Sequence, residues 1–488
     1  MASEVYGPPV LVAAVKDLMR IVPASSQLRV EFGPVPATAG VISCVVNQEF
    51  TVNVNTTSNE LRQIKHAARR ALVGALNLAL PWLSLPWGTL TGIRPTKIVH
   101  RLLDQGLSPQ VIVQCLRAEY LIRPDKAELV LEVALRQRKY LLTPEAAQRS
   151  VSVYVGIPFC PTRCLYCSFP SYIGNLPRLQ TYLSVVEQEI AALGGALQER
   201  DIQVQTLYVG GGTPTMLDPA QLSELLESCC RHIVTAATQE FTVEAGRPDT
   251  INAANLQLMA DYGVTRVSIN PQSMRAHTLQ AMGRDHTPEQ VKKSFALARS
   301  LGFTQINMDI IMGLPGEDRE DVAYTLQELC SLDPDNLTVH ALALKRAATL
   351  RQEVEALALP SAQVAEAMQE LVQGAARDMG MEPYYLYRQK QIFGNLENVG
   401  YAKPGKESIY NIQIMAERQS ILAVGAGGAS KLVKPGEWSL CNFQHPKQPE
   451  AYYARWRQDL TRVLTMLDEF TLAPIDKTAY NAYNYDET

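Results

Sequence analysis

Residues 151–167 read VSVYVGIPFCPTRCLYC, a short apolar strand pattern that leads directly into three closely spaced cysteines. Cys160, Cys164 and Cys167 form a CxxxCxxC motif, and thiolates at this spacing can bind one corner of an iron–sulfur cubane. Because a [4Fe–4S] cluster has four irons, three cysteines leave one iron open to a small molecule with an amine and a carboxylate. The alternative is a structural zinc site, which needs a fourth cysteine or histidine, and the next histidine is His232.

The alternation of strand and helix continues beyond this motif. The strand candidates are Val151–Ile157, Val204–Val209, Glu240–Glu244, Val264–Ile269, Gln305–Ile310 and Asn336–Leu344. The helical patterns between them are Arg178–Gln198, Pro219–His232, Ala253–Tyr262, Pro288–Leu301 and Glu317–Leu332. Six strands that alternate with helices predict a parallel sheet with right-handed crossovers, curled into a full or partial barrel. Functional groups should then lie at the carboxyl ends of the strands.

Residues 1–148 have a different pattern, which predicts an α+β domain. The alternating segment Gly40–Asn55 predicts a hairpin that turns near Asn47 and Gln48, and helical patterns follow over residues 58–80, 109–117 and 124–140. The segment Trp87–Lys97 (WGTLTGIRPTK) predicts an ordered loop whose Arg94 and Lys97 could approach an anion. The alternative for this segment is a tight turn between domains.

Residues 346–488 form a C-terminal extension that we expect to close the mouth of the barrel. Helical patterns cover Ser361–Met379 and about Pro449–Leu467. Between them lie the tyrosine-rich run YYLYRQK (384–390) and the apolar, glycine-containing segment ILAVGAGGASK (421–431). The predicted domains are therefore residues 1–148, 149–345 and 346–488.

Composition narrows the class of protein. Of 488 residues, 47% are hydrophobic and 19% are charged, which excludes a disordered or fibrous chain. The formal net charge of -4 argues against a chain-wide surface for polyanions, so we expect no nucleic-acid partner. Nine cysteines are too few for a disulfide scaffold, and charged residues near the N-terminus argue against a secretory signal. The most apolar run, Ala71–Trp87, falls short of the roughly 20 residues of a membrane span. We expect a cytoplasmic monomer with no membrane span.

The order of the motifs resembles the radical S-adenosylmethionine (SAM) superfamily, and within it the oxygen-independent coproporphyrinogen III oxidase/dehydrogenase family, in particular its HemZ-like branch. The matching segments are YVGIPFC (154–160) with Cys164 and Cys167, GGGTPT (210–215), Glu244, RVSINPQ (266–272), Gly283-Arg284 and NMDIIMGLP (307–315). The tail segments and WGTLTGIRPTK resemble the HemZ-like branch specifically. The resemblance implies an α/β fold: a radical SAM partial (β/α)6 barrel with an N-terminal α+β domain and a C-terminal extension.

The resemblance also implies cofactors and their contacts. Cys160, Cys164 and Cys167 would hold a [4Fe–4S] cluster, and one or two SAM molecules would bind beside it. The implied SAM contacts are Tyr154, Tyr166, Gly211, Gly212, Thr213, Glu244, Gln272, Arg284, Asp309 and Ala343. Of these, Glu244 would accept hydrogen bonds from a ribose diol, while Gln272, Arg284 and Asp309 would contact a second SAM. The alternatives are a plain turn at the glycines, a helix-cap role for Glu244, and an ion pair between Arg284 and Asp309.

The implied reaction converts coproporphyrinogen III to protoporphyrinogen IX. A 5′-deoxyadenosyl radical takes hydrogen from a propionate side chain, which then loses CO2 and an electron to leave a vinyl group. An electron donor of flavodoxin or ferredoxin type is implied as a partner. Candidate contacts to the tetrapyrrole carboxylates are Tyr385, Tyr387, Arg388 and Lys390, with Arg94 and Lys97. The alternative for the tyrosine run is a strand that packs on the barrel.

The chain departs from the family pattern after the third cysteine. The decarboxylases of the family carry a further cysteine two positions on, where this chain has Phe169. Related haem chaperones share the radical SAM core but bind haem and do not decarboxylate. Three function classes therefore stay open: a SAM-dependent decarboxylase, a haem carrier that retains the cluster, and a radical enzyme that acts on another substrate.

Overall fold

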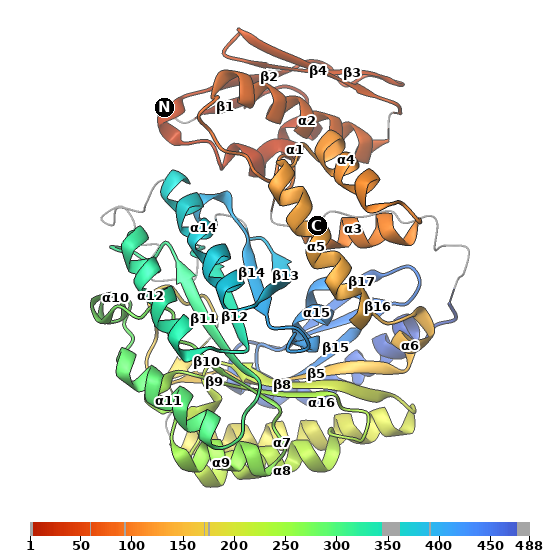
Figure 1. Ribbon diagram of the computed structural model, residues 1–488. Helices are drawn as coiled ribbons and strands as arrows, with labels where there is room; N and C mark the ends of the chain where they lie inside the picture. Colours follow the sequence, from red (N-terminus) through yellow and green to blue (C-terminus); the bar gives the residue numbers. More distant parts are fainter. Residues whose placement is uncertain are drawn as a thin grey trace. The chain divides into compact units, whose positions relative to one another are not determined.

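The computed structural model describes residues 3–58, 60–91, 94–169, 171–173, 176–343, 362–389 and 392–475 (Figure 1). The chain forms two compact units. The first contains Met1–Ala134, Ser361–Glu366 and Leu386–Asn398, and the second contains Leu135–Pro360, Ala367–Tyr385 and Val399–Thr488. Short C-terminal segments therefore belong to the first unit, although most of the C-terminal region belongs to the second.

The first unit is built on a four-stranded sheet in the order β1-β2-β3-β4. Its strands are β1 (Glu4–Tyr6), β2 (Arg29–Phe32), β3 (Gly40–Val46) and β4 (Phe50–Thr56). The predicted hairpin is present, and Asn47 and Gln48 turn it with φ of 54° and 61°. Helices α1 (Pro9–Met19) and α2 (Leu61–Ala79) bury their apolar stripes with the sheet in one core, because leucine and alanine recur there at helical spacing.

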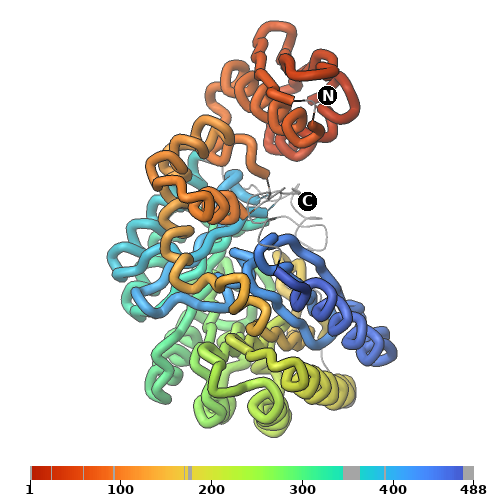
Figure 2. The backbone as a smooth tube through the Cα atoms, turned by 90° about the vertical axis from the view of Figure 1, so that its right-hand side faces the viewer, coloured from red at the N-terminus to blue at the C-terminus, as the bar shows by residue number. Residues whose placement is uncertain are grey.

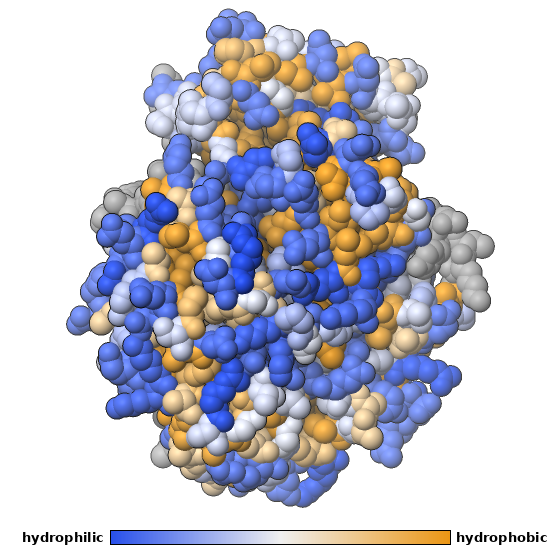
Figure 3. Space-filling view, in the orientation of Figure 1, coloured by the Kyte–Doolittle hydropathy of each residue, from blue (hydrophilic) through white to orange (hydrophobic). Residues whose placement is uncertain are grey.

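Three further helices follow in the first unit, namely α3 (Pro95–Asp104), α4 (Pro109–Tyr120) and α5 (Pro124–Gln137), whose last turn lies in the second unit. The loop predicted over Trp87–Lys97 ends earlier than expected, since Pro95 occupies the first turn of α3. Proline is favoured there because its missing N–H has no intrahelical acceptor. In the view of Figure 3, apolar side chains gather over these helices, and Val111 on α4 is among the exposed ones.

The second unit contains the predicted parallel sheet, and the α/β barrel fold is confirmed. Its six parallel strands are β5 (Ser150–Ile157), β8 (Gln203–Gly211), β9 (Glu240–Gly246), β10 (Arg266–Ile269), β11 (Ile306–Met312) and β12 (Asn336–Ala341). The connecting helices are α7 (Leu176–Glu199), α8 (Pro219–His232), α9 (Ala253–Asp261), α10 (Ala276–Ala281), α11 (Pro288–Ser300) and α12 (Arg319–Leu332). Helices α7, α8, α9 and α11 cover the outer face of the sheet (Figure 1).

C-terminal residues extend this sheet at both edges. Strand β15 (Ser420–Val424) pairs parallel with β5, and β16 (Ala429–Lys434) and β17 (Ser439–Gln444) continue beyond it. At the other edge, β14 (Asn398–Ala402) pairs antiparallel with β12, and β13 (Glu382–Tyr387) follows after α14 (Ala362–Asp378). Helix α16 (Pro449–Met466), dark blue in Figure 2, packs on α7. The C-terminal region is thus an integral part of the eleven-stranded sheet.

In the described part of the chain, no helix combines the length and the apolar character that a membrane crossing requires.

Candidate cofactor site

The three cysteines lie on a loop that follows β5. The short strand β6 (Phe159–Cys160) follows β5 and pairs with β7 (Tyr172–Ile173). The backbone N–H of Leu165 donates to the carbonyl of Met282 at 3.1 Å, and the N–H of Cys167 donates to the Cys164 carbonyl at 3.1 Å. The loop is therefore fixed both internally and against the segment that precedes Arg284.

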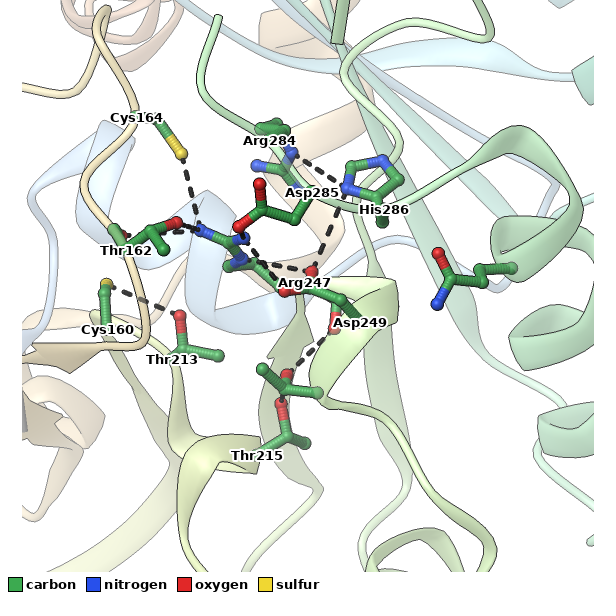
Figure 4. A network of polar contacts seen from close by, with 12 residues as sticks. Cys160, Thr162, Cys164, Thr213, Thr215, Arg247, Asp249, Arg284, Asp285 and His286 are labelled. Atoms are coloured by element: carbon green, nitrogen blue, oxygen red, sulfur yellow. Dashed lines mark hydrogen bonds and ion pairs between the residues drawn. The ribbon is translucent and has the colours of Figure 1, made fainter. Parts of the chain in front are cut away.

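Arg247, just after β9, joins the strand ends to the cysteine loop (Figure 4). Its Nη1 donates to Thr162 Oγ1 at 2.7 Å and lies 3.9 Å from the sulfur of Cys164. Its Nε and Nη2 donate to the two carboxylate oxygens of Asp249 at 3.1 and 2.9 Å. This two-pronged pairing fixes the plane of the guanidinium, so that its remaining edge faces the loop.

Arg284 holds the other side of the same loop. Its Nη1 donates to the hydroxyl of Tyr166 at 2.9 Å and its Nη2 to the carbonyl of Asn270 at 2.8 Å. The ring of His286 lies next to it, with Nδ1 3.3 Å from Arg284 Nε. Burial, reinforced by the charge of Arg284, lowers the pKa of His286 to about 3, so this imidazole is neutral at physiological pH.

The glycine segment, which begins in the last residues of β8, packs directly against the start of the cysteine loop. The N–H of Gly212 donates to the carbonyl of Ile157 at 2.8 Å, and that of Thr213 to Phe159 at 2.7 Å. A Cβ at Gly212 would lie 2.3 Å from the Phe159 carbonyl oxygen, so only glycine fits there. The hydroxyl of Thr213 lies 3.4 Å from the Cys160 sulfur (Figure 4). The glycines are thus more than a plain turn, because they bring the ends of β5 and β8 into contact.

Glu244 spans from β9 to the glycine segment. Its carboxylate accepts hydrogen bonds from the Tyr208 hydroxyl at 2.5 Å and the Gly211 N–H at 3.1 Å. Burial raises the pKa of Glu244 to about 7, and the nearby charge of Asp309 acts in the same direction. The helix-cap alternative for Glu244 is wrong, since its partners lie on the neighbouring strand.

Three tyrosine rings stack beneath this carboxylate. The ring centroid of Tyr208 lies 6.0 Å from that of Tyr154 on β5 and 4.5 Å from that of Tyr410 on α15 (Ile409–Ala416), and the latter two are 6.4 Å apart, so the three rings form a triangular cluster. Helix α15 is held by Glu240, which accepts from the Ser408 hydroxyl and from the Ile409 and Tyr410 N–H groups at 2.9, 2.9 and 3.2 Å. The C-terminal region therefore contributes an aromatic side chain to the inner face of the sheet.

Of the residues predicted to contact a second SAM, Gln272 follows β10 and Asp309 lies within β11. Gln272 has φ of 65° and bridges to Ile310, and its N–H donates to the Asp309 carbonyl at 2.9 Å. The Asp309 carboxylate accepts from the Asn307 side chain at 2.7 Å and lies 3.8 Å from His340 Nε2. Arg284 and Asp309 have different partners, so the ion-pair alternative is wrong. Ala343 lies just beyond β12.

Several buried polar atoms on this inner face have no hydrogen-bond partner. They are Thr242 Oγ1, Ser268 Oγ, Asn270 Oδ1 and Gln272 Oε1. Thr242 shares a face of β9 with Glu244, and Ser268 is paired in register with Glu244. Each such atom costs about 1–3 kcal/mol when left unpaired in a protein interior. A polar ligand such as the adenosyl moiety of SAM would fit these groups.

The run predicted to bind the substrate is divided between the two units. In the second unit, the hydroxyl of Tyr385 lies 3.4 Å from Thr338 Oγ1, and its ring occupies the space that a Cβ at Gly400 would fill. In the first unit, the Tyr387 carbonyl accepts from Asn398 at 3.4 Å. Lys390 lies outside the described residues.

Arg388 has a different role from the one predicted. Its guanidinium is buried over the ring of Trp87 and donates to the backbone carbonyls of Leu90, Asn395 and Leu396. Burial lowers the pKa of Arg388 to about 10. The prediction that Arg388 contacts substrate carboxylates is corrected, because these carbonyls already occupy its donors and it forms part of the core of the first unit.

The thiol donors suit an iron–sulfur cluster. Thr213 and Arg247 direct hydrogen atoms at the sulfurs of Cys160 and Cys164, as thiolate ligands require. Burial raises the pKa of Cys160 and of Cys167, so metal binding must displace their protons. Among the described residues, no three His, Cys, Asp or Glu side chains are grouped closely enough to hold a single ion. The three thiolates of a cubane surround one cluster but bind three separate irons, so they do not meet on a single ion.

Sequence reasoning missed Arg247, Tyr208 and Tyr410. Arg247 directly follows the motif that contains Glu244, and its position at a strand end was the available signal. Tyr208 precedes the glycine segment at the spacing that puts its side chain on the inner face. For Tyr410 no local signal exists, because it reaches the site only through the docking of α15.

Comparisons with known proteins agree with this geometry. The sequence model of the Radical SAM superfamily matches residues 154–329. The chain is 39% identical over 417 residues to the oxygen-independent coproporphyrinogen-III oxidase-like protein HemZ of Bacillus subtilis (strain 168), covering 85% of this chain and 83% of that protein. It is 30% identical to the heme chaperone HemW of the same organism, over 57% of this chain and 69% of HemW. The structure of coproporphyrinogen III oxidase (HemN) from Escherichia coli, a radical SAM enzyme, matches with a TM-score of 0.53 and 25% identity, over 67% of this chain and 73% of HemN.

Proposed function

Because the chain belongs to the radical SAM family of oxygen-independent coproporphyrinogen-III oxidase-like proteins, in the HemZ branch, we propose that it decarboxylates coproporphyrinogen III oxidatively to protoporphyrinogen IX. The observation that carries this proposal is the meeting of the cysteine loop, the glycine segment and Glu244 at the carboxyl ends of β5, β8 and β9. Reactive groups of a parallel α/β barrel belong at this end of the strands.

In this proposal Cys160, Cys164 and Cys167 hold a [4Fe–4S] cluster. When bound, the cluster and SAM supply one-electron cleavage of a carbon–sulfur bond and so a carbon radical that removes hydrogen from a propionate side chain. Gly211, Gly212 and Thr213 would line the place of the SAM amino group, whose own N–H groups need acceptors, while Glu244 would accept hydrogen bonds from its ribose diol. The cluster of Tyr154, Tyr208 and Tyr410 would cover the inner face of the sheet next to it and exclude water.

A second SAM would contact Tyr166, Gln272, Arg284, Asp309 and Ala343. The unpaired oxygens of Ser268, Asn270 and Gln272 support a polar ligand in this place. The domain roles stay as predicted from the sequence, with residues 149–345 as the catalytic core and a task for residues 1–148 still to be assigned. The electron would come from a flavodoxin- or ferredoxin-type donor.

A haem carrier is the second candidate function. Two observations favour it: relatives at 30% and 32% identity are named heme chaperone HemW, and Phe169 stands where the decarboxylases of the family have a further cysteine. The Phe169 side chain is 61% exposed beside the cysteine loop, so it forms part of the surface rather than of the core.

Anaerobic product analysis tests the proposal. The reconstituted protein is incubated with dithionite, SAM and coproporphyrinogen III, and we expect 5′-deoxyadenosine together with a vinyl-bearing porphyrin after oxidation. Cys164→Ala should lose the cluster and both products. Cys330→Ala, on α12 and away from the loop, is the matched control and should keep both.

Other results of this experiment would favour other functions or contradict the proposed ligands. SAM cleavage without porphyrin conversion would favour a different substrate. Stoichiometric haem binding without turnover would favour the carrier. About three irons per chain instead of four, or a full cluster in Cys160→Ala, would contradict the proposed ligands.

A further inference from the structure

Arg247 is held between a carboxylate and a cysteine sulfur. The side chain is 5% exposed, and one edge of its guanidinium pairs with both oxygens of Asp249. Its Nη1 points away from Asp249 toward Thr162 and the sulfur of Cys164, at 2.7 and 3.9 Å (Figure 4). The family motifs recognised in the sequence do not include this arginine, and the proposed reaction does not require it.

The charged groups around Arg247 determine which end of the Arg247–Asp249 pair faces the sulfur of Cys164. Asp249 lies on the far side from Cys164, and Asp285, 3.8 Å from Nη2, is exposed. His286 lies 4.0 Å from Asp249 and is neutral. The Arg247–Asp249 pair is therefore a buried dipole whose positive end faces the sulfur. Such a dipole acts strongly because the protein interior screens it less than water does.

We propose that Arg247 is a positioning residue that anchors the cysteine loop and raises the reduction potential of the cluster bound there. The inference rests on the proposed cluster ligands. When a cluster gains one electron from a reductant, negative charge increases on its sulfurs. An N–H donor and a positive dipole end at a ligand sulfur stabilise that reduced state. A weaker one-electron donor can then reduce the protein.

Two substitutions should shift the potential in opposite directions. Arg247→Met removes the donor and the positive charge at similar length, so the midpoint potential should become more negative. Asp249→Asn keeps the guanidinium but removes the opposing carboxylate, so the potential should become more positive. Arg299→Met is the matched control, because it breaks another arginine–aspartate pair, with Asp335, at the end of α11. The measurement is the electron paramagnetic resonance signal of the reduced cluster against applied potential, without SAM, together with iron per chain.

A merely structural role would change iron content but leave the potential of the loaded protein unaltered. Equal potentials in wild type, Arg247→Met and Asp249→Asn would therefore overturn the inference. If Arg247→Met holds no iron, Asp249→Asn decides alone, and an unshifted or more negative potential there would overturn it. A wild-type protein that binds no iron would contradict the proposed cluster site itself.

Discussion

Glu244 is the side chain whose charge matters most at the candidate site. Its buried carboxyl faces Tyr208 on β8, Asp309 on β11, His340 on β12 and the rings of Tyr154 and Tyr410. Burial raises its pKa to about 7, whereas the hydrogen bond from Tyr208 lowers it. The ionised form accepts on both oxygens and binds a ribose diol more strongly than the protonated form, so protonation and SAM binding compete.

We therefore predict that SAM affinity depends on pH. Below a pH of about 7 the ionised fraction of Glu244 falls, so the Kd should rise about tenfold per pH unit, and above it the Kd should be constant. Calorimetric titration of the cluster-loaded protein between pH 5.5 and 8.5 measures this. Glu244→Gln should bind at least about tenfold more weakly at pH 8 and show a flat profile. A flat profile in the wild type would contradict the prediction.

Tyr208→Phe should move this profile without abolishing binding. The substitution removes the hydroxyl that donates to Glu244 at 2.5 Å but keeps the ring that stacks on Tyr410. The pKa of Glu244 should rise further, so the midpoint of the SAM titration should move to higher pH. Tyr453→Phe, on α16, is the control and should leave the midpoint in place. An unchanged midpoint in Tyr208→Phe would mean that its hydroxyl does not tune Glu244.

The residues predicted from sequence and those missed differ in the kind of information they need. Cysteine spacing is a local pattern, so the amino-acid order alone predicts Cys160 as a site residue, whereas the roles predicted for Gly211 and Glu244 are implied by the resemblance to the family. Arg388 looked like a substrate contact because its sequence neighbours are aromatic and basic, yet its partners include Leu90, far away in the chain. Burial and long-range partners decide such roles.

Whole strands also divide into those predicted from local sequence patterns and those that depend on partners distant in the chain. The six parallel strands were predicted because each is an apolar run bounded by helical patterns. Strand β15 was recognised only as an apolar segment, since its pairing partner β5 lies more than 260 residues earlier in the chain. The segment ends in glycines that allow close approach to the end of β5: a Cβ at Gly425 would lie 2.6 Å from the Gly156 carbonyl oxygen.

The attachment of helix α15 by Glu240 can be tested by substitution. Glu240 accepts three hydrogen bonds at its N-terminus and lies 3.4 Å from Arg266 Nη2. Glu240→Ala would leave these donors and a buried guanidinium without their carboxylate, so we expect a loss of about 3 to 5 kcal/mol in the free energy of unfolding. Chemical denaturation measures the loss, and near-ultraviolet circular dichroism should report displacement of Tyr410.

The control for this helix is Glu227→Ala on α8, whose pair with Arg231 is exposed at both ends. Exposed pairs contribute about 0.2 to 1 kcal/mol, so this variant should differ little from wild type. If the two substitutions reduce stability equally, Glu240 does not hold α15.

At the scale of the second unit, a buried polar network joins elements that are distant in sequence. Glu189 on α7 accepts from the Gly425 N–H at 3.0 Å and from the Tyr452 hydroxyl on α16. His445, after β17, lies 3.4 Å from Glu189 and 3.6 Å from Asp459. Tyr182 connects this network to β5 by donating to the Gly156 carbonyl at 2.5 Å. The C-terminal strands and the strand before the cysteine loop are thus braced together.

This network makes stability depend on pH with a definite sign. Burial raises the pKa of Glu189 to about 7 from an ordinary value of 4.5, so the folded state binds a proton more tightly than the unfolded state. Its contribution to stability is fully present below about pH 4.5 and is lost as pH rises through 7. Glu244 and Glu317, also raised to about 7, act in the same direction. The lowered pKa values of His66, His286 and His445 act in the opposite direction.

The raised carboxyl pKa values and the lowered histidine pKa values change the wild-type stability in opposite directions as pH rises. The difference in unfolding free energy between a variant and the wild type therefore reports one group more clearly. Glu189→Gln removes one raised carboxyl, so its unfolding free energy relative to wild type should increase from pH 5 to pH 8, by at most about 3 kcal/mol. Urea denaturation at both pH values measures the change. Glu199→Gln, exposed on the same helix, should show a difference that is independent of pH. If Glu189→Gln behaves like Glu199→Gln, the pKa of Glu189 is not raised in the folded protein and the network carries a negative charge.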